Sequence, residues 1–371
     1  MYTSPEEVAV CNLCSFSLPA FFNENLEGKF DHQLFYDVVR HFTGNLDNII
    51  DINYYPIPEA EYSNKRHRPI GEGVQGFAEL CFMAKIPYDS PEAAKLNEEI
   101  FETLYFAALS ESCHLAKTKG KYDSYEGSPV SKGILQFDMW GEKPKSGRWN
   151  WDGLRQEIAQ HGIRNSELIA PMPTATTSSI FGNTEAFEAQ TSNCYARQTL
   201  SGHHQIVNPF LVRDLLALGL WTEEIRNLII AHKGSVQAIP QIPDNIKAIY
   251  KTVWEIKQRV VADMAADRGK YVTQSMSLNV HMSHPDADEL KKRLTGYHFY
   301  AWKKGLKTGM YYFRTESTAE AQQFTVDPSL LKKAAVTQAP VEVAKPVVTI
   351  ADPEEDGPVC TMQEGCFTCG S

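Results

Sequence analysis

The chain has 371 residues, 43% hydrophobic and 11% aromatic, which is enough to bury a sizeable core in one large domain or two smaller ones. Its formal net charge of -10 argues against a sequence-independent grip on nucleic acid or on an anionic membrane, because both require clustered positive charge. No apolar run approaches the roughly 20 residues of a membrane span, and the amino terminus lacks a signal-peptide pattern. We therefore expect a cytoplasmic protein with no nucleic acid and no membrane among its partners.

The first predicted element is a short buried strand over Glu7–Leu13 that leads into Ser15–Phe22. Further along, Gly71-Glu72-Gly73-Val74-Gln75-Gly76 matches the dinucleotide-binding fingerprint letter for letter. Its context argues against that role, because a polar run precedes the first glycine where the fingerprint needs a hydrophobic strand. We interpret the segment as a glycine-rich turn into a closely packed helix.

The clearest helix begins at Ser90, a residue type that caps helix amino termini, with Pro91 in the first helical position, and it ends near Gly120. Cys113 lies in this helix among apolar neighbours, and Cys81 lies in another apolar stretch, so we expect both thiols to be buried in the core. Eight cysteines without dense regular spacing do not resemble the disulfide framework of a secreted protein.

An apolar strand, Leu168–Pro173, ends in a cluster of hydroxyl-bearing and small residues that begins with Thr174, Ala175, Thr176 and Thr177. A turn of this kind can present backbone N–H groups and hydroxyls to a phosphate. An ordinary Ser/Thr loop is the alternative, and the pattern by itself favours it.

A second long helix is predicted from Asp244 to about Arg268, where Gly269 ends it. A strand over Met276–His281, a helix from Asp286 to about Leu306 and a strand over Met310–Phe313 follow. This order predicts a right-handed crossover between two parallel strands.

Tyr311 and Tyr312 are adjacent phenols within the last predicted strand. Neighbouring strand residues point to opposite faces, so both rings can stack in one functional path only if the backbone is locally unusual. The alternative is a pair of core aromatics. No metal site is predicted, because the closely spaced histidines lack a further ligand at metal spacing; they are His203, His204, His281 and His284.

The stretch after residue 328 contains four prolines and an acidic run without apolar periodicity, a composition typical of a disordered linker. At its end, Cys366 and Cys369 form a C-x-x-C pair, and a dithiol at an exposed chain end favours disulfide exchange. Half a zinc site made with Cys360 is the alternative, but further ligands are lacking. We predict three parts: a folded region over 1–328, a flexible linker over 329–359 and a redox-active tail over 360–371.

Together, several segments resemble the large, catalytic subunit of class I ribonucleotide reductase, of the eukaryotic and viral type. They are Glu7–Leu13, Arg66–Gly71, Tyr125–Gly133, Ala170–Thr177, Gln205–Pro209, Gly305–Tyr312 and Cys366–Ser371. The resemblance covers nearly the whole chain except the linker. It implies an α/β fold, the second half of a ten-stranded α/β barrel, and the reduction of ribonucleoside diphosphates to deoxyribonucleoside diphosphates by radical chemistry.

The resemblance also implies roles for single residues. Cys11 matches one member of the active-site dithiol that is oxidised as substrate is reduced, whereas Cys14 stands where relatives often have a small residue. The loop formed by Thr174, Ala175, Thr176 and Thr177 matches the segment that holds the substrate phosphates, which reverses the preference for an ordinary loop.

Tyr311 and Tyr312 match the stacked pair that passes the radical from the small subunit to the active site. Cys366 and Cys369 match the tail dithiol that re-reduces the active site and is itself reduced by thioredoxin or glutaredoxin. No cofactor is expected on this chain. A diiron or dimanganese radical cofactor is expected in the small subunit.

The family's Asn-x-Cys-x-Glu finger loop, the partner of Cys11 and the first half-barrel would fall before Met1. We therefore expect the C-terminal part of a split, interrupted or truncated large subunit, inactive alone and active when the N-terminal part completes the barrel. A half-barrel exposes strand edges and apolar surface, which favours a partner. The alternative is a catalytically silent remnant or binding module. The retained cysteines and tyrosines named above favour the active complement.

Overall fold

The structure is a computed structural model that describes residues 4–199 and 202–316, and it divides into two compact units. Unit 1 contains the described residues up to Ala189 together with Val260–Val280 and Tyr300–Phe313. Unit 2 contains Gln190–Arg259, His281–Phe299 and the described residues from Arg314 onward. The predicted linker and tail, with Cys366 and Cys369, lie outside the described residues.

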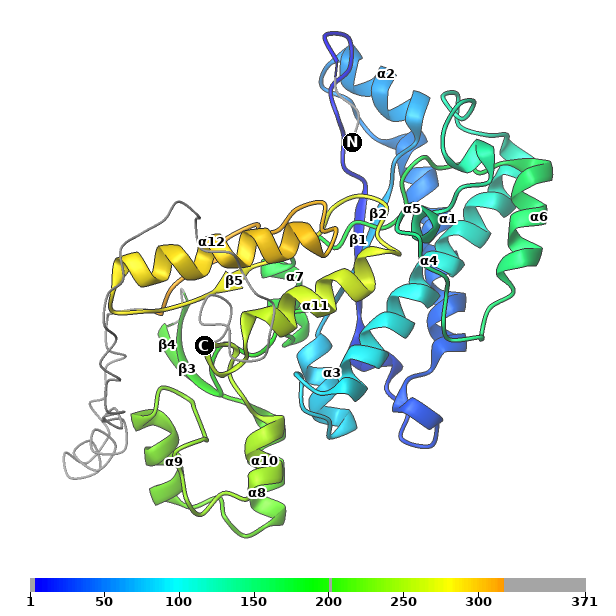
Figure 1. The fold of residues 1–371 in the computed structure, drawn as a ribbon. Coiled ribbons are helices and arrows are strands. Elements are labelled where there is room, and N and C mark those ends of the chain that lie inside the picture. Colours follow the sequence, from blue (N-terminus) through cyan, green and yellow to red (C-terminus); the bar gives the residue numbers. More distant parts are fainter. Residues whose placement is uncertain (1–3, 200–201, 317–371) are drawn as a thin grey trace, which may run out of the picture. The chain divides into compact units, whose positions relative to one another are not determined.

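A row of parallel extended segments forms the centre of unit 1 (Figure 1). Strand β1 (Leu13–Ser17) pairs with β2 (Gly71–Gln75) along its whole length. The segment 168–171 follows on the other side of β2, because the Glu72 N–H donates to the Leu168 carbonyl at 2.8 Å and the Ala170 N–H donates to the Glu72 carbonyl at 2.9 Å.

Two further extended segments continue this row in chain order. The N–H groups of Gln274 and Ser277 donate to carbonyls of the 168–171 segment at 3.0 and 2.9 Å. The Tyr311 N–H then donates to the Leu278 carbonyl, just before the short strands β5 (Val280–His281) and β6 (Phe313–Arg314). Unit 1 thus has five neighbouring parallel segments, and the described residues form no closed barrel.

Helices α1 (His32–Ile52) and α4 (Pro91–Lys119) pack along each other beside this row (Figure 1). The core between α1 and the sheet is aromatic: the rings of Phe16 and Phe35 meet edge to face with centroids 5.6 Å apart. Unit 1 also contains α2 (Pro58–His67), α3 (Phe77–Ala84), α5 (Gln136–Met139), α6 (Trp151–His161) and α7 (Ala175–Phe181).

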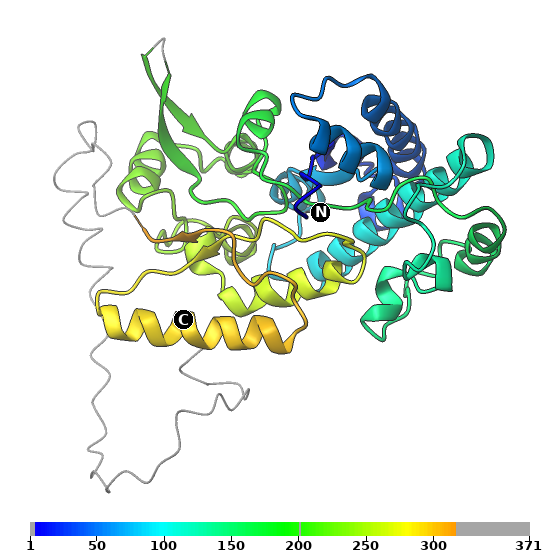
Figure 2. The same ribbon diagram turned by 90° about the horizontal axis from the view of Figure 1, so that it is seen from above.

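Unit 2 contains an antiparallel hairpin of β3 (Cys194–Thr199) and β4 (Gly202–Val207), drawn in green in Figure 2. Asn193, directly before the hairpin, donates through its side chain to the carbonyls of Gly234 and Tyr250 at 3.0 and 2.8 Å. The helices of this region are α8 (Pro209–Ala217), α9 (Glu223–Ala231) and α10 (Asp244–Ile249). The two bonds thus connect the start of the hairpin to the residues that follow α9 and α10.

The predicted helix from Ser90 to Gly120 is confirmed as α4. The Ser90 hydroxyl accepts the Ala93 N–H at 3.1 Å, and Gly120 ends the helix with φ of +82°. Cys81 and Cys113 are buried, as expected.

The predicted strand over Glu7–Leu13 is wrong, since β1 begins only at Leu13. The Glu7 carboxylate bonds His67 at 2.8 Å and Arg66 at 3.2 Å, and the Val8 N–H donates to the Glu59 carbonyl. Tertiary contacts with α2 therefore hold this stretch where strand pairing was expected.

The continuous helix from Asp244 to Arg268 is also wrong. The chain forms α10, a 3₁₀ turn (Val253–Glu255) and α11 (Gln258–Gly269). A capping box causes the break: the Thr252 N–H donates to the Glu255 carboxylate at 2.7 Å, which starts a new turn. By contrast, the strand–helix–strand order near the end is confirmed as β5, α12 (Ala287–Lys303) and β6.

The glycine fingerprint is the strand β2 itself, not a turn. A Cβ at Gly71 would lie 2.5 Å from a Leu13 methyl carbon and 2.9 Å from the Ala170 Cβ, so only glycine fits between these neighbouring strands. The turn into α3 is limited to Gly76, whose φ is +78°. Of the predicted glycine-rich turn into a packed helix, only Gly76 has that role.

Candidate functional site

The two faces of β1 and β2 differ in their surroundings. Side chains alternate along a strand, and the face that carries Phe16 and Glu72 packs against α1, where the Thr43 hydroxyl donates to Glu72 at 2.8 Å. The opposite face carries Ser15, Ser17 and Gln75, and we call it the inner face. Its polar side chains lie beside the loop that follows the 168–171 segment.

The predicted phosphate loop forms the start of α7. Thr174 is the residue before the helix, and its hydroxyl is turned inward to accept the Ala186 N–H at 2.8 Å. Ala175, Thr176 and Thr177 form the exposed first turn. The first backbone hydrogen bond of α7 runs from the Ser178 N–H to the Thr174 carbonyl. The N–H groups of the three exposed residues precede this bond, so they have no acceptor carbonyl within α7.

Side chains from β1 and β2 fix this loop. The Thr177 hydroxyl donates to the Gln75 Oε1 at 3.0 Å, and the Asn183 side chain donates to the Ser17 hydroxyl at 2.9 Å. Beyond α7, both carboxylate oxygens of Glu79 accept bonds from Thr184. The loop therefore has a defined position at the carboxyl end of the sheet. Sequence reasoning missed Gln75, Asn183 and Glu79.

Cys11 lies at the opposite, amino end of the sheet, just before β1, and it is exposed. Its neighbour Asn12 is buried and donates through its side chain to Asn64 and to the Pro69 carbonyl, both at 2.9 Å. Cys14 is a poor disulfide partner, because three residues of extended chain span about 10 Å, beyond the reach of a disulfide. Burial, and secondarily Glu72, raise the pKa of the Cys14 thiol far above its ordinary value.

Glu72 is a further residue that sequence reasoning missed. Its carboxyl is completely buried, and this burial raises its pKa to about 8, against the opposing effect of the Thr43 bond. Within the described part of the chain, its Oε2 has no hydrogen-bond partner. Glu72 is therefore expected to be largely protonated near neutral pH.

Tyr311 and Tyr312 are 47% and 54% exposed, so the core-aromatic alternative is wrong. Their ring centroids lie 4.3 Å apart with planes at 65°, and the backbone bends at Tyr311. A hydrogen bond with Tyr312 raises the pKa of the Tyr311 hydroxyl. The two phenols thus form a connected pair at the surface of unit 1.

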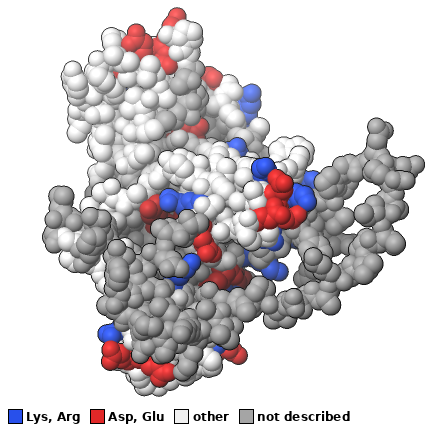
Figure 3. All heavy atoms as spheres, turned by 90° about the vertical axis from the view of Figure 1, so that its left-hand side faces the viewer, with Lys and Arg blue, Asp and Glu red and all other residues white. Residues whose placement is uncertain are grey.

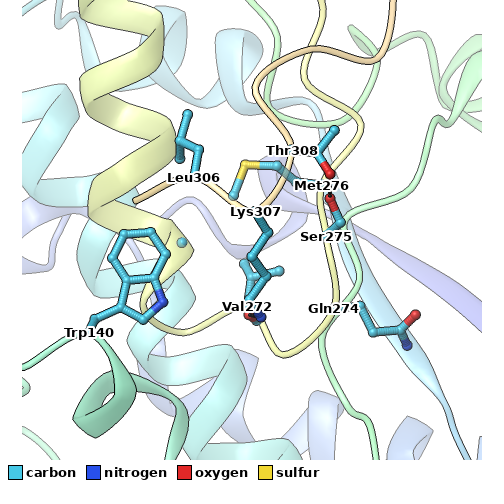
Figure 4. A pocket seen from close by; sticks show the side chains of 9 residues that line it. Trp140, Val272, Gln274, Ser275, Met276, Leu306, Lys307 and Thr308 are labelled. Atoms are coloured by element: carbon cyan, nitrogen blue, oxygen red, sulfur yellow. Dashed lines mark hydrogen bonds between the residues drawn. The ribbon is translucent and has the colours of Figure 1, made fainter. Parts of the chain in front are cut away.

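The segment that leads to these tyrosines lines a small cavity (Figure 4). Lys307 donates to the carbonyls of Val272 and Thr273 at 2.9 and 2.6 Å, and the Ser275 hydroxyl donates to the Thr308 hydroxyl at 2.6 Å. The cavity volume of about 10 Å³ has room for about one water molecule and is far below the roughly 300–1,000 Å³ of ligand pockets. Its polar contacts fasten the last parallel segment to the one before it.

The described residues contain no group of three or more His, Cys, Asp or Glu side chains arranged to hold a metal ion. None of their helices is long and apolar enough to cross a membrane. On the face shown in Figure 3, the described Lys and Arg side chains gather in small groups close to Asp and Glu, without a continuous basic area.

The chain is similar to known proteins over most of its length. A family profile described as "Ribonucleotide reductase, barrel domain" matches residues 1–312. The ribonucleoside-diphosphate reductase large chain of Schizosaccharomyces pombe is 53% identical over 94% of this chain, and the large subunit of Danio rerio is 51% identical over 100% of it. The chain covers only 42% and 45% of these two relatives.

A solved structure, the class Id ribonucleotide reductase alpha subunit of Actinobacillus ureae, is 28% identical, with a TM-score of 0.64. The similarity covers 85% of this chain and 51% of the solved chain. The sequence and fold comparisons agree, and this chain belongs to the ribonucleotide reductase barrel-domain family.

Proposed function

We propose that this chain is the C-terminal part of a ribonucleoside-diphosphate reductase large subunit and supplies the second half of its ten-stranded barrel. It reduces ribonucleoside diphosphates to deoxyribonucleoside diphosphates once an N-terminal part and a small subunit are present. One observation carries the proposal. The five parallel segments position Cys11 before the first, Thr174–Thr177 after the third and Tyr311–Tyr312 in the fifth. One sheet thus carries residues that are far apart in the sequence and have the proposed roles.

In this proposal, Cys11 and a cysteine of the N-terminal part supply the reducing equivalents. Their two thiols become a disulfide and release two electrons and two protons. The ribose 2′-hydroxyl leaves as water, and hydrogen takes its place. The exposure of Cys11 supports this role, since the thiol must reach a second cysteine and a substrate.

The Thr174–Thr177 loop holds the diphosphate of the substrate. Its exposed first helical turn offers N–H groups and the hydroxyls of Thr176 and Thr177, while the buried Thr174 hydroxyl anchors the loop.

Tyr311 and Tyr312 carry the radical by losing and regaining an electron and a proton at each hydroxyl. Their exposure and their mutual hydrogen bond support transfer from the surface, where a small subunit would dock. The chain itself is proposed to hold no cofactor; the diiron or dimanganese radical centre belongs to the small subunit. Thioredoxin or glutaredoxin, acting through Cys366 and Cys369, restores the active-site thiols. A cytoplasmic location is part of the same proposal.

A reconstitution tests this function. The full chain, an N-terminal large-subunit part, a small subunit, a dithiol and a ribonucleoside diphosphate are mixed, and deoxyribonucleotide is measured. We expect product from the complete mixture, none without the N-terminal part and none with Cys11→Ser. Product without the N-terminal part would contradict the need for a complement. A stable assembly that makes no product would favour the alternative, a silent remnant or binding module.

A further inference from the structure

Asn12, the residue after Cys11, is buried and makes hydrogen bonds through both its side chain and its backbone. Its Nδ2 donates to the Asn64 Oδ1 and to the Pro69 carbonyl, each at 2.9 Å. A backbone carbonyl only accepts, so the Pro69 contact fixes which end of the amide is nitrogen. The Asn12 carbonyl in turn accepts the Gly71 N–H at 2.8 Å. Three bonds therefore hold this residue to the chain that leads from α2 into β2.

A chain of hydrogen bonds to α1 fixes the Asn64 acceptor. The Asn64 Nδ2 donates to the Tyr55 oxygen at 2.5 Å, and the Tyr55 hydroxyl donates to the Ile50 carbonyl at 2.6 Å. Ile50 lies in α1, and its carbonyl sets the direction of the chain because it only accepts. Donors and acceptors are therefore matched at every step from Asn12 to α1.

A buried ion pair fixes the Pro69 carbonyl. Arg68, the residue before it, is buried, and its guanidinium donates to the carboxylates of Asp47 and Asp51 in α1 at 2.8–2.9 Å. The Arg68 backbone is left-handed, with φ of +48°, which is uncommon for a residue other than glycine. The turn between α2 and β2 is thus tied to α1, and Asn12 is tied to this turn.

Packing alone does not require an amide at position 12. A buried amide costs free energy unless it is hydrogen-bonded, and leucine has a similar size. Hydrogen bonds, unlike apolar contacts, have narrow ranges of distance and angle, so they fix the backbone beside the exposed Cys11. The chain before Cys11 is also tied to α2, where the Glu7 carboxylate bonds His67. Cys11 therefore lies between two points that α2 holds.

We propose that Asn12 is a positioning residue for the Cys11 thiol in its disulfide with a cysteine of the N-terminal part. In that step two thiols form one sulfur–sulfur bond and give two electrons and two protons to the substrate. A disulfide requires two Cα atoms about 4.4–6.8 Å apart, so a fixed Cys11 reaches this geometry more often than a mobile one. The inference rests on the proposed function and adds a residue that acts through Cys11.

The reduction potential of the Cys11 disulfide in the assembled protein tests the proposal. Asn12→Leu keeps the approximate size of the side chain and removes both bonds of the amide. We expect it to weaken the disulfide about three- to tenfold, the loss of roughly one hydrogen bond, which raises the potential by about 15–30 mV. The two polypeptides are equilibrated in glutathione buffers, and their cross-linked fraction is measured on non-reducing gels. Cys366→Ser and Cys369→Ser in the same chain prevent exchange with the tail.

A pair of variants at Asn64 gives a second test that does not alter Asn12. Asn64→Asp keeps an acceptor oxygen for the Asn12 amide, whereas Asn64→Leu removes it. Both variants lose the bond to Tyr55, so both should lower thermal stability. Only Asn64→Leu should raise the potential, by less than Asn12→Leu does, because the bond to the Pro69 carbonyl remains.

Two controls separate positioning from a general loss of stability. Asn193 is a buried asparagine that also precedes a cysteine and donates to the carbonyls of Gly234 and Tyr250. Asn193→Leu should lower thermal stability without shifting the potential of the Cys11 disulfide. The mixed disulfide of Cys11 with glutathione needs no second cysteine. Its potential, measured by mass spectrometry on the full chain, should be the same with and without Asn12→Leu.

The outcomes separate the two proposals. An unchanged potential in Asn12→Leu, or an equal shift in Asn193→Leu or in the glutathione disulfide, would overturn the role of Asn12 even if the assembly makes product. If Asn12→Leu does not fold, equal potentials in the two Asn64 variants would overturn it. A shift as expected in an assembly that makes no deoxyribonucleotide would overturn only the proposed function. A wild-type assembly without any Cys11 disulfide would overturn both.

Discussion

The rings of Tyr311 and Tyr312 lie with their centroids 4.3 Å apart, although neighbouring residues of an extended strand normally point to opposite faces. The bend at Tyr311, just before β6, brings them to the same side. Packing does not explain this arrangement, because two half-exposed rings bury little apolar surface.

Tyr311→Phe and Tyr312→Phe should each abolish turnover in the reconstituted enzyme. Phenylalanine keeps the ring but removes the hydroxyl that loses an electron and a proton in the proposed radical path. Since both rings are exposed, the free energy of unfolding should change by less than about 0.5 kcal/mol. Product formation and urea unfolding are measured on the same preparations; full activity in either variant would remove that tyrosine from the path.

Lys307→Met should reduce kcat more than it changes KM. The lysine fastens the chain before Tyr311 to the carbonyls of Val272 and Thr273, and the loss of these charged bonds should cost about 1.5–3 kcal/mol of stability. Lys307→Arg should recover part of both losses. Steady-state kinetics and thermal unfolding check this expectation. A normal kcat in a destabilised Lys307→Met protein would show that the clamp is only structural.

Glu72→Gln should change the pH dependence of stability. The folded carboxyl has a pKa of about 8, against 4.5 as the ordinary value. Between these values the unfolded chain releases a proton that the folded chain keeps, so the wild-type free energy of unfolding should fall as pH rises, by up to about 1.4 kcal/mol per pH unit. Above pH 8 this decline should level off.

The Gln variant lacks this contribution and should show a flatter profile in urea unfolding between pH 5 and 8. Glu24→Gln, at an exposed position, is the control and should follow the wild type. Identical slopes for the wild type and Glu72→Gln would mean that the buried carboxyl is ionised in the folded protein.

The double variant Cys366→Ser with Cys369→Ser should allow about one round of product from pre-reduced protein and then stop with thioredoxin as the reductant. In the proposed function, the active-site disulfide is reduced by the tethered dithiol, through thiol–disulfide exchange. A small diffusible dithiol should partly restore turnover. The buried thiols are controls: Cys81→Ser and Cys113→Ala should keep turnover with modest losses of stability. Sustained thioredoxin-dependent turnover by the double variant would exclude the tail as carrier.

Local signals predicted some elements well. Helix α4 was predictable because its signals are local: the Ser90 hydroxyl accepts the Ala93 N–H, Pro91 fixes the backbone of the first helical position, and the Gly120 N–H donates to the Ala116 carbonyl. The long helix after Asp244 was not, since the bond between Thr252 and Glu255 outweighs an apolar stripe that continues through it.

Distant contacts explain the other errors. The strand β2 resembles a turn in sequence because of its glycines, but Gly71 is required by Leu13 and Ala170, which approach from other strands. In the site, Cys11, the loop and the tyrosine pair followed from the resemblance. Gln75 and Asn183 did not, because their partners Thr177 and Ser17 lie 102 and 166 positions away in the chain.

The position of β1 has a consequence for how such a protein could be made in a cell. Among the described residues β1 pairs only with β2, and Leu13 at its start is 45% exposed, so one side of its backbone is open to a further strand. An open edge accepts any compatible strand, including that of a second copy. If the N-terminal part is a separate polypeptide, its synthesis must keep pace with that of this chain. If the N-terminal part is made later, it has to compete with second copies of this chain for the open edge of β1.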